Sequence, residues 1–292
     1  MQRALSQGMA ATELWSLLLA VIEQRAAQRT PATVRQQWES DRFVQPCALN
    51  QRMLNELDSH LLAAAADFEA LELSPVAPLA SCSTVALTSQ NRIVSTARGT
   101  EVVSDPTNVL ALECARRLRE IPGATIKLTT SHRCVRAQAV PKRPGFAAHF
   151  RMFCLASAAH ERKDHGFVVE ALIEHIRTHL AALDRLEKHG YRFPDRRLRL
   201  LATPERRHLA ERISQEITGL PITLETLEHR YYDGLRFMLD AGTPDGTPVP
   251  LIDGGAFDWL GKLTDNKRMV FVASGLGSQL AAMLFRRVAQ IA

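Results

Sequence analysis

The stretches TIKLTTSHRCVR (residues 125–136) and AAHFRMFCLAS (residues 147–157) decide the fold of this chain. Both are rich in β-branched and apolar residues, and both have the length of a strand. The loop between them, which contains Pro-Lys-Arg-Pro-Gly (141–145), is typical of a chain reversal. The pattern therefore predicts an antiparallel pair of strands, and so a sheet made of hairpins rather than parallel crossovers.

Helices and further strands are predicted on either side of this pair. Apolar residues that recur every three to four positions predict helices at 12–29, 49–68, 107–120, 166–189 and 205–217, and from Gly277 to the C-terminus. Strands are predicted at 72–76, 198–202 and 269–273, with hairpins of 84–88 with 92–96 and of 231–239 with 249–252. Pro248 and Pro250 flank Val249, so its strand should be short or at a sheet edge. The order indicates an α+β fold, with a mostly antiparallel sheet flanked by helices. A helical extension (1–45) should precede a single core domain (46–292).

Composition excludes several classes of protein. With 292 residues, 46% hydrophobic and 23% charged, the chain is neither disordered nor fibrous. The net charge is +5 and the pI is 9.1, but no basic block stands alone, so charge by itself does not indicate nucleic-acid binding. The five cysteines show no C-x-x-C spacing, which favours free thiols. The N-terminal apolar run at residues 17–22 is too short for a membrane span, so a cytoplasmic protein is expected.

Two histidines raise the question of a metal site. His175 and His179 lie four residues apart on a predicted helix, beside Glu174, and such a pair can bind zinc. The acid precedes both histidines instead of lying between them, so we expect a solvated helix face and no metal. No serine occurs in G-x-S-x-G, so nucleophilic catalysis has no support either.

Two sets of polar residues are candidates for a binding site. Arg133 and Arg136 end the first strand of the 125–157 hairpin and could grip a phosphate, or could lie on a solvated sheet face. Tyr231-Tyr232-Asp233-Gly234 and Gly254-Gly255-Ala256-Phe257-Asp258 flank the second hairpin. They could line a concave small-molecule site, or they could form an aromatic core pair with turn glycines. The residues alone leave both alternatives open.

Taken in order, these motifs resemble the catalytic core of class II aminoacyl-tRNA synthetases. Within that class they are most similar to the histidyl enzyme and its shortened paralogue, the regulatory subunit of ATP phosphoribosyltransferase. Three stretches match the class motifs: Leu73-Ser74-Pro75 is similar to motif 1, residues 132–138 to the F-R-Y-E-R-P-Q of motif 2, with residues 149–153 as its returning strand, and Gly275-Leu276-Gly277 to motif 3. Asp105-Pro106-Thr107 is similar to the acid-x-Thr of the amino-acid pocket. Residues 231–234 and 254–258 resemble the Y-Y-T-G and G-G-R-Y-D signatures of the histidyl enzymes. The resemblance covers about residues 46–292 and includes no anticodon-binding domain.

The chain departs from the family at positions that serve activation. Val135 occupies the place of the motif 2 glutamate, and Ser278-Gln279-Leu280 replaces the x-E-R of motif 3. Leu227 stands where active histidyl enzymes have an arginine, and Leu155 and Ala159 replace the Gln and Glu that bind the amino acid. Amino-acid activation needs cations on the transferring phosphates. We therefore expect no aminoacylation, unless Arg136, Arg143 or Arg230 takes over.

The resemblance implies a binding site and a function. The implied substrate-binding residues are Asp105, Thr107, Arg133, Arg136, Gln138, Tyr231, Tyr232, Gly254 and Gly255. The preferred interpretation is a non-aminoacylating paralogue that binds a small polar ligand, amino-acid-like or nucleotide-like. It would act as a regulatory subunit, as a homodimer through the segment around Pro75, and with an enzyme as its partner. ATP and Mg²⁺ are expected only if activation is retained, and neither tRNA nor a membrane is expected as a partner.

Two other functions stay open on the sequence. One is an ATP-dependent amino-acid ligase or aminoacyl-transferring enzyme with a rebuilt active site. The other is a dimeric nucleic-acid-binding accessory protein, which the pI of 9.1 favours and the absence of a separate basic module opposes.

Overall fold

A computed structural model describes residues 1–139, 147–228, 231–243 and 246–286. The helices in this part of the chain are α1 (Gln2–Gln7), α2 (Ala11–Ala27), α3 (Pro31–Ser40), α4 (Gln51–Ala64), α5 (Pro106–Glu120), α6 (Gly166–Glu187), α7 (Arg207–Glu216), α8 (Trp259–Leu263) and α9 (Ser278–Leu284). The strands are β1 (Glu69–Ala70), β2 (Val76–Pro78), β3 (Thr100–Val102), β4 (Ile126–Val135), β5 (His149–His160), β6 (Arg197–Ala202), β7 (Ile222–Thr226), β8 (Leu235–Gly242), β9 (Pro248–Phe257) and β10 (Met269–Leu276).

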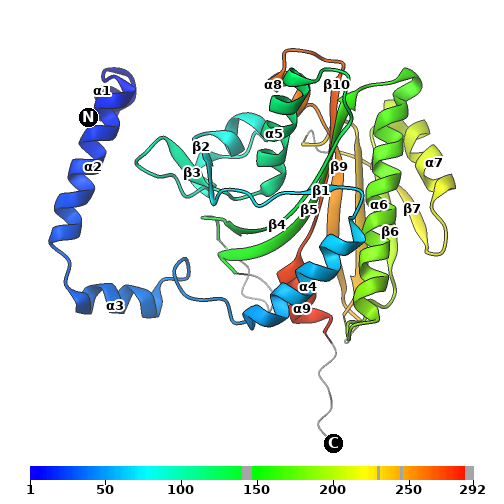
Figure 1. The fold of residues 1–292 in the computed structure, drawn as a ribbon, viewed down its shortest axis with the longest axis horizontal. Helices are drawn as coiled ribbons and strands as arrows, with labels where there is room; N and C mark the ends of the chain where they lie inside the picture. The colour runs from blue at the N-terminus through cyan, green and yellow to red at the C-terminus, as the bar shows by residue number, and fades with distance from the viewer. Residues whose placement is uncertain (140–146, 229–230, 244–245, 287–292) are drawn as a thin grey trace, which may run out of the picture.

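Eight strands form one mixed, mostly antiparallel sheet in the order β1-β4-β5-β10-β9-β8-β6-β7 (Figure 1). The hairpin β4–β5 pairs from Ile126 opposite Ala158 to Val135 opposite His149, as expected from the sequence. Only the outermost pairs, β1 with β4 and β6 with β7, are parallel. The predicted α+β class with a mostly antiparallel sheet is confirmed.

Helices cover both faces of the sheet, and the alternation of β5 separates two apolar cores. Phe153 and Leu155 pack with α4, α6 and α9 on one face. Cys154 and Ala156 point to the other face and pack with α5 and α8. Since successive side chains of a strand point to opposite faces, the residue parity of β4 and β5 decides on which side a functional group lies.

The predicted hairpin of 84–88 with 92–96 is wrong. Residues Ser81–Val85 form a π-helical turn and Gln90–Arg92 a 3₁₀ turn. The buried carboxylate of Glu101 accepts hydrogen bonds from the backbone N–H groups of Ala80 and Cys82 and from the side-chain amide of Gln90. These bonds draw the segment into turns around one carboxylate, which the apolar alternation could not reveal. The strand predicted at 72–76 is also displaced, because β2 begins at Val76.

The strand around Val249 is longer than predicted, because β9 spans ten residues. Its residues 252–255 pair with both β8 and β10, whereas residues 248–250, which include both prolines, have strand partners on β8 alone and form a local edge, as the prolines predicted. A register shift between Leu239 and Asp240 of β8 leaves Leu251 without a partner on β8, and Pro250 falls at this irregularity. A bulge removes the need for the regular ladder hydrogen bond that proline cannot donate. The helix expected to reach the C-terminus ends at Leu284.

The first 45 residues form helices α1, α2 and α3, which extend away from the sheet (Figure 1). None of their residues is buried. The chain joins the core at residues 41–50, just before α4. No helix among the described residues is long and apolar enough to cross a membrane.

Candidate functional site

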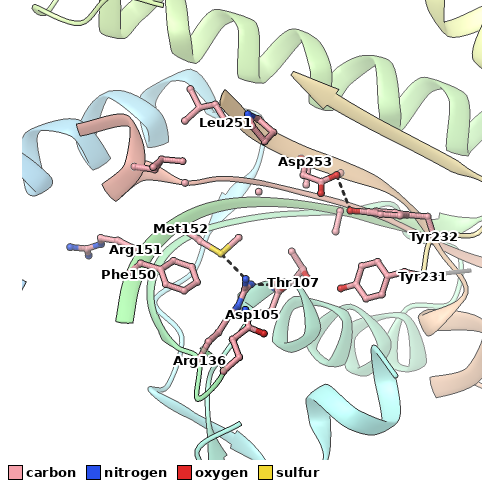
Figure 2. A pocket seen from close by; sticks show the side chains of 18 of the residues that line it. Asp105, Thr107, Arg136, Phe150, Arg151, Met152, Tyr231, Tyr232, Leu251 and Asp253 are labelled. Atoms are coloured by element: carbon pink, nitrogen blue, oxygen red, sulfur yellow. Dashed lines mark hydrogen bonds and ion pairs between the residues drawn. The ribbon is translucent and has the colours of Figure 1, made fainter. Parts of the chain in front are cut away.

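A cavity of about 530 Å³ lies on the α5 side of the sheet (Figure 2). This volume is typical of sites that take a small molecule. Residues of α5, β5, β9, β10 and α9 line it, together with the segments that follow β4 and precede β8. The predicted residues among the lining are Asp105, Thr107, Arg136, Gln138, Tyr231, Tyr232 and Gly254. The structure therefore brings together seven of the nine predicted positions, which come from four separate segments.

Asp105 begins α5 and holds one wall of the cavity. Its Oδ1 accepts hydrogen bonds from the backbone N–H of Thr107 at 3.0 Å and from the Thr107 hydroxyl at 2.7 Å. This is the N-cap arrangement, in which a carboxylate satisfies an otherwise unpaired helical N–H. The spacing of Asp105 and Thr107 therefore has a structural explanation in the start of α5, independent of any ligand in the cavity.

Arg136 faces Asp105 across this wall. Its Nη2 lies 3.6 Å from Asp105 Oδ2, while its Nε donates to the backbone carbonyl of Ser104 at 3.0 Å. The guanidinium also lies over the Phe150 ring, with its carbon 4.9 Å from the ring centroid. Figure 2 shows Arg136 and Asp105 side by side below Met152. At 3.6 Å the ion pair is long, so both groups keep hydrogen-bonding capacity toward the cavity.

The two tyrosines form the opposite wall. The Tyr232 hydroxyl donates to Asp253 Oδ1 at 2.9 Å, and Arg236 binds the same carboxylate through two nitrogens at 2.9 and 2.7 Å. Burial and the neighbouring Asp253 carboxylate raise the pKa of Tyr232 well above its ordinary value, so it stays a hydrogen-bond donor. Burial likewise raises the pKa of Tyr231. The strand predicted to begin at Tyr231 begins at Leu235 instead, and both tyrosines lie on the turn before β8.

Gly254 and Gly255 are needed for packing. A Cβ on Gly255 would lie 2.3 Å from the Leu235 carbonyl oxygen and 2.5 Å from the Tyr232 ring. A Cβ on Gly254 would meet Ser274 Cβ at 2.4 Å on the other face of the sheet. Gly255 is not among the residues that line the cavity; its lack of a side chain lets the Tyr232 ring lie against β9.

Arg133 does not line the cavity, contrary to the placement that the resemblance implied. Its Nη1 bonds His149 Nδ1 at 3.0 Å and Gln279 Oε1 at 3.3 Å, on the face covered by α4 and α9. The reason is strand parity: Cys134 and Arg136 point to the cavity face, so Arg133 and Val135 point to the other. Arg151, opposite Arg133 in the hairpin, is among the lining residues, but its side chain points away from Asp105 and Arg136 (Figure 2) and pairs with Asp58 at 2.9 Å.

Asp253, Phe150 and Met152 are among the lining residues that were not predicted as site residues. Asp253 could have been found from the sequence, because it lies two residues before Gly255 and therefore on the same face of β9. Phe150 and Met152 stand on the returning strand at the parity of Cys154. No local pattern marks them as lining a site.

In the motif 3 region, no residue of the α9 start is itself a cation, although Arg133 of β4 bonds the Gln279 side chain there. Gly275 belongs to β10, where a Cβ would meet Met152 Cε at 2.8 Å, and α9 begins at Ser278. Ser278 and Gln279 are both buried, and Leu227 is a buried apolar residue. Arg143 and Arg230, the other arginines considered as substitutes, lie outside the described residues.

His175 and His179 are buried, so the predicted solvated helix face is wrong. His175 contacts Ser157 Oγ at 3.0 Å and Ser274 Oγ at 2.9 Å, and His179 contacts the same Ser274 Oγ at 2.8 Å. Burial lowers the pKa of His179 to about 3 and that of His175 well below its ordinary value, so both rings are neutral. Within the described part of the chain, no group of three or more His, Cys, Asp or Glu residues could hold a metal ion.

The fold can now be compared with known proteins. No family model and no curated protein matches this sequence. Among solved structures, an ATP phosphoribosyltransferase regulatory subunit/histidyl-tRNA synthetase from Bacillus halodurans superposes with a TM-score of 0.60 at 12% identity, over 82% of each chain. The fold is that of a class II aminoacyl-tRNA synthetase core.

Two further structures support this result. A histidine–tRNA ligase subunit from Alicyclobacillus acidocaldarius matches with a TM-score of 0.58 at 12% identity, over 82% of this chain and 96% of that chain. The histidyl-tRNA synthetase of S. aureus matches at 0.55 and 13% identity, over 79% of this chain but only 64% of the length of that enzyme. The predicted resemblance to the class II core is confirmed as a likeness of fold.

Proposed function

We propose that the chain is a class II synthetase-like protein that binds a small zwitterionic ligand and does not aminoacylate. One observation supports this most: the cavity has charges of both signs, Asp105 and Asp253 against Arg136, and Arg136 is already engaged by Asp105 and by a backbone carbonyl. A ligand with an ammonium and a carboxylate would add hydrogen bonds to Asp105 and Arg136, whose own ion pair is long, whereas Asp253 is already paired with Arg236.

The distribution of charge opposes activation. Adenylate formation places negative charge on transferring phosphates, which preorganised cations must stabilise. Where the family has an arginine after motif 3, this chain has the buried neutral Ser278 and Gln279, and Leu227 replaces a second arginine. Removing one preorganised contact of this kind lowers a rate by roughly 10²–10³.

Ligand binding is tested by thermal shift and calorimetry against the free amino acids and nucleotides. A ligand at 100 times its Kd adds about 2.7 kcal/mol of apparent stability. Arg136→Ala should abolish binding, because it removes a cation inside the cavity. Arg133→Ala is the matched control: it removes an arginine from the same strand but from the opposite face, so binding should persist. The assignment fails if Arg133→Ala loses the ligand and Arg136→Ala keeps it.

The ATP-dependent ligase is the second candidate, and the size of the cavity favours it, since 530 Å³ leaves room beyond a single amino acid. Amino-acid-dependent ATP–pyrophosphate exchange separates the two. We expect no exchange in the wild-type protein. Exchange with any amino acid would overturn the non-aminoacylating assignment and would require Arg136 or another arginine to bind the phosphates.

A regulatory role would also require a partner enzyme, as in the subunit that the fold resembles. This part of the proposal predicts that the ligand changes the activity of a partner, not of the chain itself.

A further inference from the structure

Exposed apolar residues concentrate in the N-terminal extension. Of thirteen large hydrophobic residues exposed in the described part of the chain, seven lie within the first 44 positions. On α2, Leu14, Leu17, Leu18, Val21 and Ile22 follow the spacing of one helix face, which we call the apolar stripe. Val34 and Trp38, four residues apart, continue it on α3. Five of these residues are exposed, with 42–54% of their surface accessible to solvent, as on an isolated helix: Leu17, Val21, Ile22, Val34 and Trp38.

The extension is attached to its own core in a way that leaves Leu17, Val21 and Ile22 of the stripe exposed. At its root, Arg42 donates to the backbone carbonyl of Gln138 at 3.2 Å, and the Gln45 carbonyl bonds His149 Nε2 at 2.7 Å. Near its far end, the Trp15 indole lies against Gly99, where an added Cβ would be 3.6 Å from Trp15 Nε1. Trp15 lies about a quarter of a turn around α2 from the middle of the stripe. Leu14 and Leu18 are half-buried in the single chain, so the open part of the stripe on α2 is Leu17, Val21 and Ile22.

The core presents apolar surface of its own on the protrusion formed by residues 75–102, which contains β2 and β3 (Figure 1). Val76 is exposed there, and Leu87 is 72% exposed with a left-handed backbone that leucine rarely adopts (φ 54°). The protrusion of the same chain already contacts α2, where Gly99 lies against Trp15.

We propose that two copies of this chain exchange their N-terminal extensions, so that the apolar stripe of each covers the exposed protrusion of the other. The five exposed side chains of α2 and α3 amount to on the order of 500 Å², more than half of the ~800 Å² that each partner buries in a stable interface. The protrusion supplies the remainder. A two-fold exchange buries both extensions in one closed assembly.

Charge favours a second copy over a polyanion or a charged membrane. Residues 1–45 contain five arginines and four acidic residues, so the extension is nearly neutral. Because few basic residues surround the apolar stripe, electrostatic attraction would add little to its binding to an anionic surface. The protrusion of a second chain offers exposed apolar side chains that the stripe can bury.

The test is the mass of the full-length protein by light scattering across nanomolar to tens of micromolar concentration. The wild-type protein should have twice the 32.4 kDa of one chain. The double variant Leu17→Glu/Val21→Glu, on the stripe, should weaken association at least 100-fold. Ser16→Glu/Ala20→Glu adds the same charges to the opposite face of α2 and should leave association unchanged. Because the stripe is unburied in the single chain, circular dichroism of all variants should show a folded core.

A photo-crosslinking residue at position 21 locates the contact. When tagged and untagged chains are mixed, adducts should join two chains and map to residues 75–102 of the second. A wild-type monomer at all concentrations overturns the proposal. So does a dimer whose affinity the stripe variant leaves unchanged, which would point to the segment around Pro75 alone. The proposal is also wrong if all adducts form within one chain. It is wrong too if the wild-type protein binds anionic vesicles and does not dimerise.

Discussion

Replacing Gly255 by alanine tests the packing on which the tyrosine wall depends. The new Cβ would lie 2.3 Å from the carbonyl oxygen of Leu235 and 2.5 Å from Cδ1 of Tyr232. The carbonyl belongs to β8, which is paired with β9 at this point, so it cannot move without disturbing the strand pair. The Tyr232 ring can tilt only by giving up its hydrogen bond to Asp253.

The magnitude follows from these contacts. Overpacking in a core costs about 1–3 kcal/mol when side chains can adjust. Here backbone must move as well, so we expect a loss of at least ~3 kcal/mol in the free energy of unfolding. With about 2.1 cal/mol/K of unfolding entropy per residue, a chain of this length should melt roughly 5 °C lower. Differential scanning calorimetry measures this directly.

Gly123→Ala is the control for loss of glycine itself. No heavy atom lies within 4 Å of a Cβ at Gly123, and its backbone is not in the left-handed region. This variant should be unchanged or up to ~1 kcal/mol more stable, because alanine restricts the unfolded chain. A melting temperature of Gly255→Ala equal to that of Gly123→Ala would refute the packing argument. The position of the Tyr232 ring would then not depend on the absence of a side chain at position 255.

Three further outcomes follow from the histidine network on the other face of the sheet. Ser274→Ala should cost roughly 2–5 kcal/mol in urea denaturation, because it leaves His175 Nδ1 and His179 Nε2 buried without partners. Ser157→Ala removes one such contact and should cost about half as much. Stability should fall on acidification, since both histidines stay neutral in the folded protein while the unfolded chain takes up protons below its ordinary pKa of about 6.5. The loss between pH 7 and pH 5 should approach ~4 kcal/mol, and a His179→Gln variant that kept the full pH dependence would contradict this account.

Periodicity alone predicts much of the fold. Helices α4, α5, α6 and α7 and strands β4, β5 and β6 lie within a few residues of their predicted ranges, because each shows one apolar face to a nearby core. Prediction fails where a distant group decides the conformation. Residues 81–92 form turns because of the Glu101 carboxylate, and β9 is longer than predicted because a bulge in its pairing with β8 accommodates Pro250. Neither cause is visible within the window of residues that a periodicity covers.

The site was predicted by the order of its motifs and not by any one of them. Asp105 caps a helix, Tyr231 lies on a turn, and Gly254 has a packing role, so each also has a purely structural explanation. The resemblance to the class II core predicted that these segments converge, and they line one cavity. Whether the cavity binds a ligand remains the prediction that the Arg136→Ala and Arg133→Ala pair addresses.

The position of Arg133 shows that a resemblance of motifs does not determine on which face of the sheet a side chain lies. In the family pattern F-R-Y-E, the arginine and the glutamate are two residues apart, so both face the same side of their strand. Matching that arginine to Arg133 sends it and Val135 to the face of α4 and α9, away from the cavity. Cys134 and Arg136, also two residues apart, lie on the cavity side of the sheet, and Arg136 lines the cavity. On that side this strand therefore has a thiol followed by a guanidinium, where the family pattern has a guanidinium followed by a carboxylate. Burial raises the pKa of Cys134, so the thiol stays neutral and Arg136 is the charged member of the pair. Arg136→Ala therefore removes the charge that this pair presents to a ligand, whereas Arg133→Ala removes a charge from the opposite face.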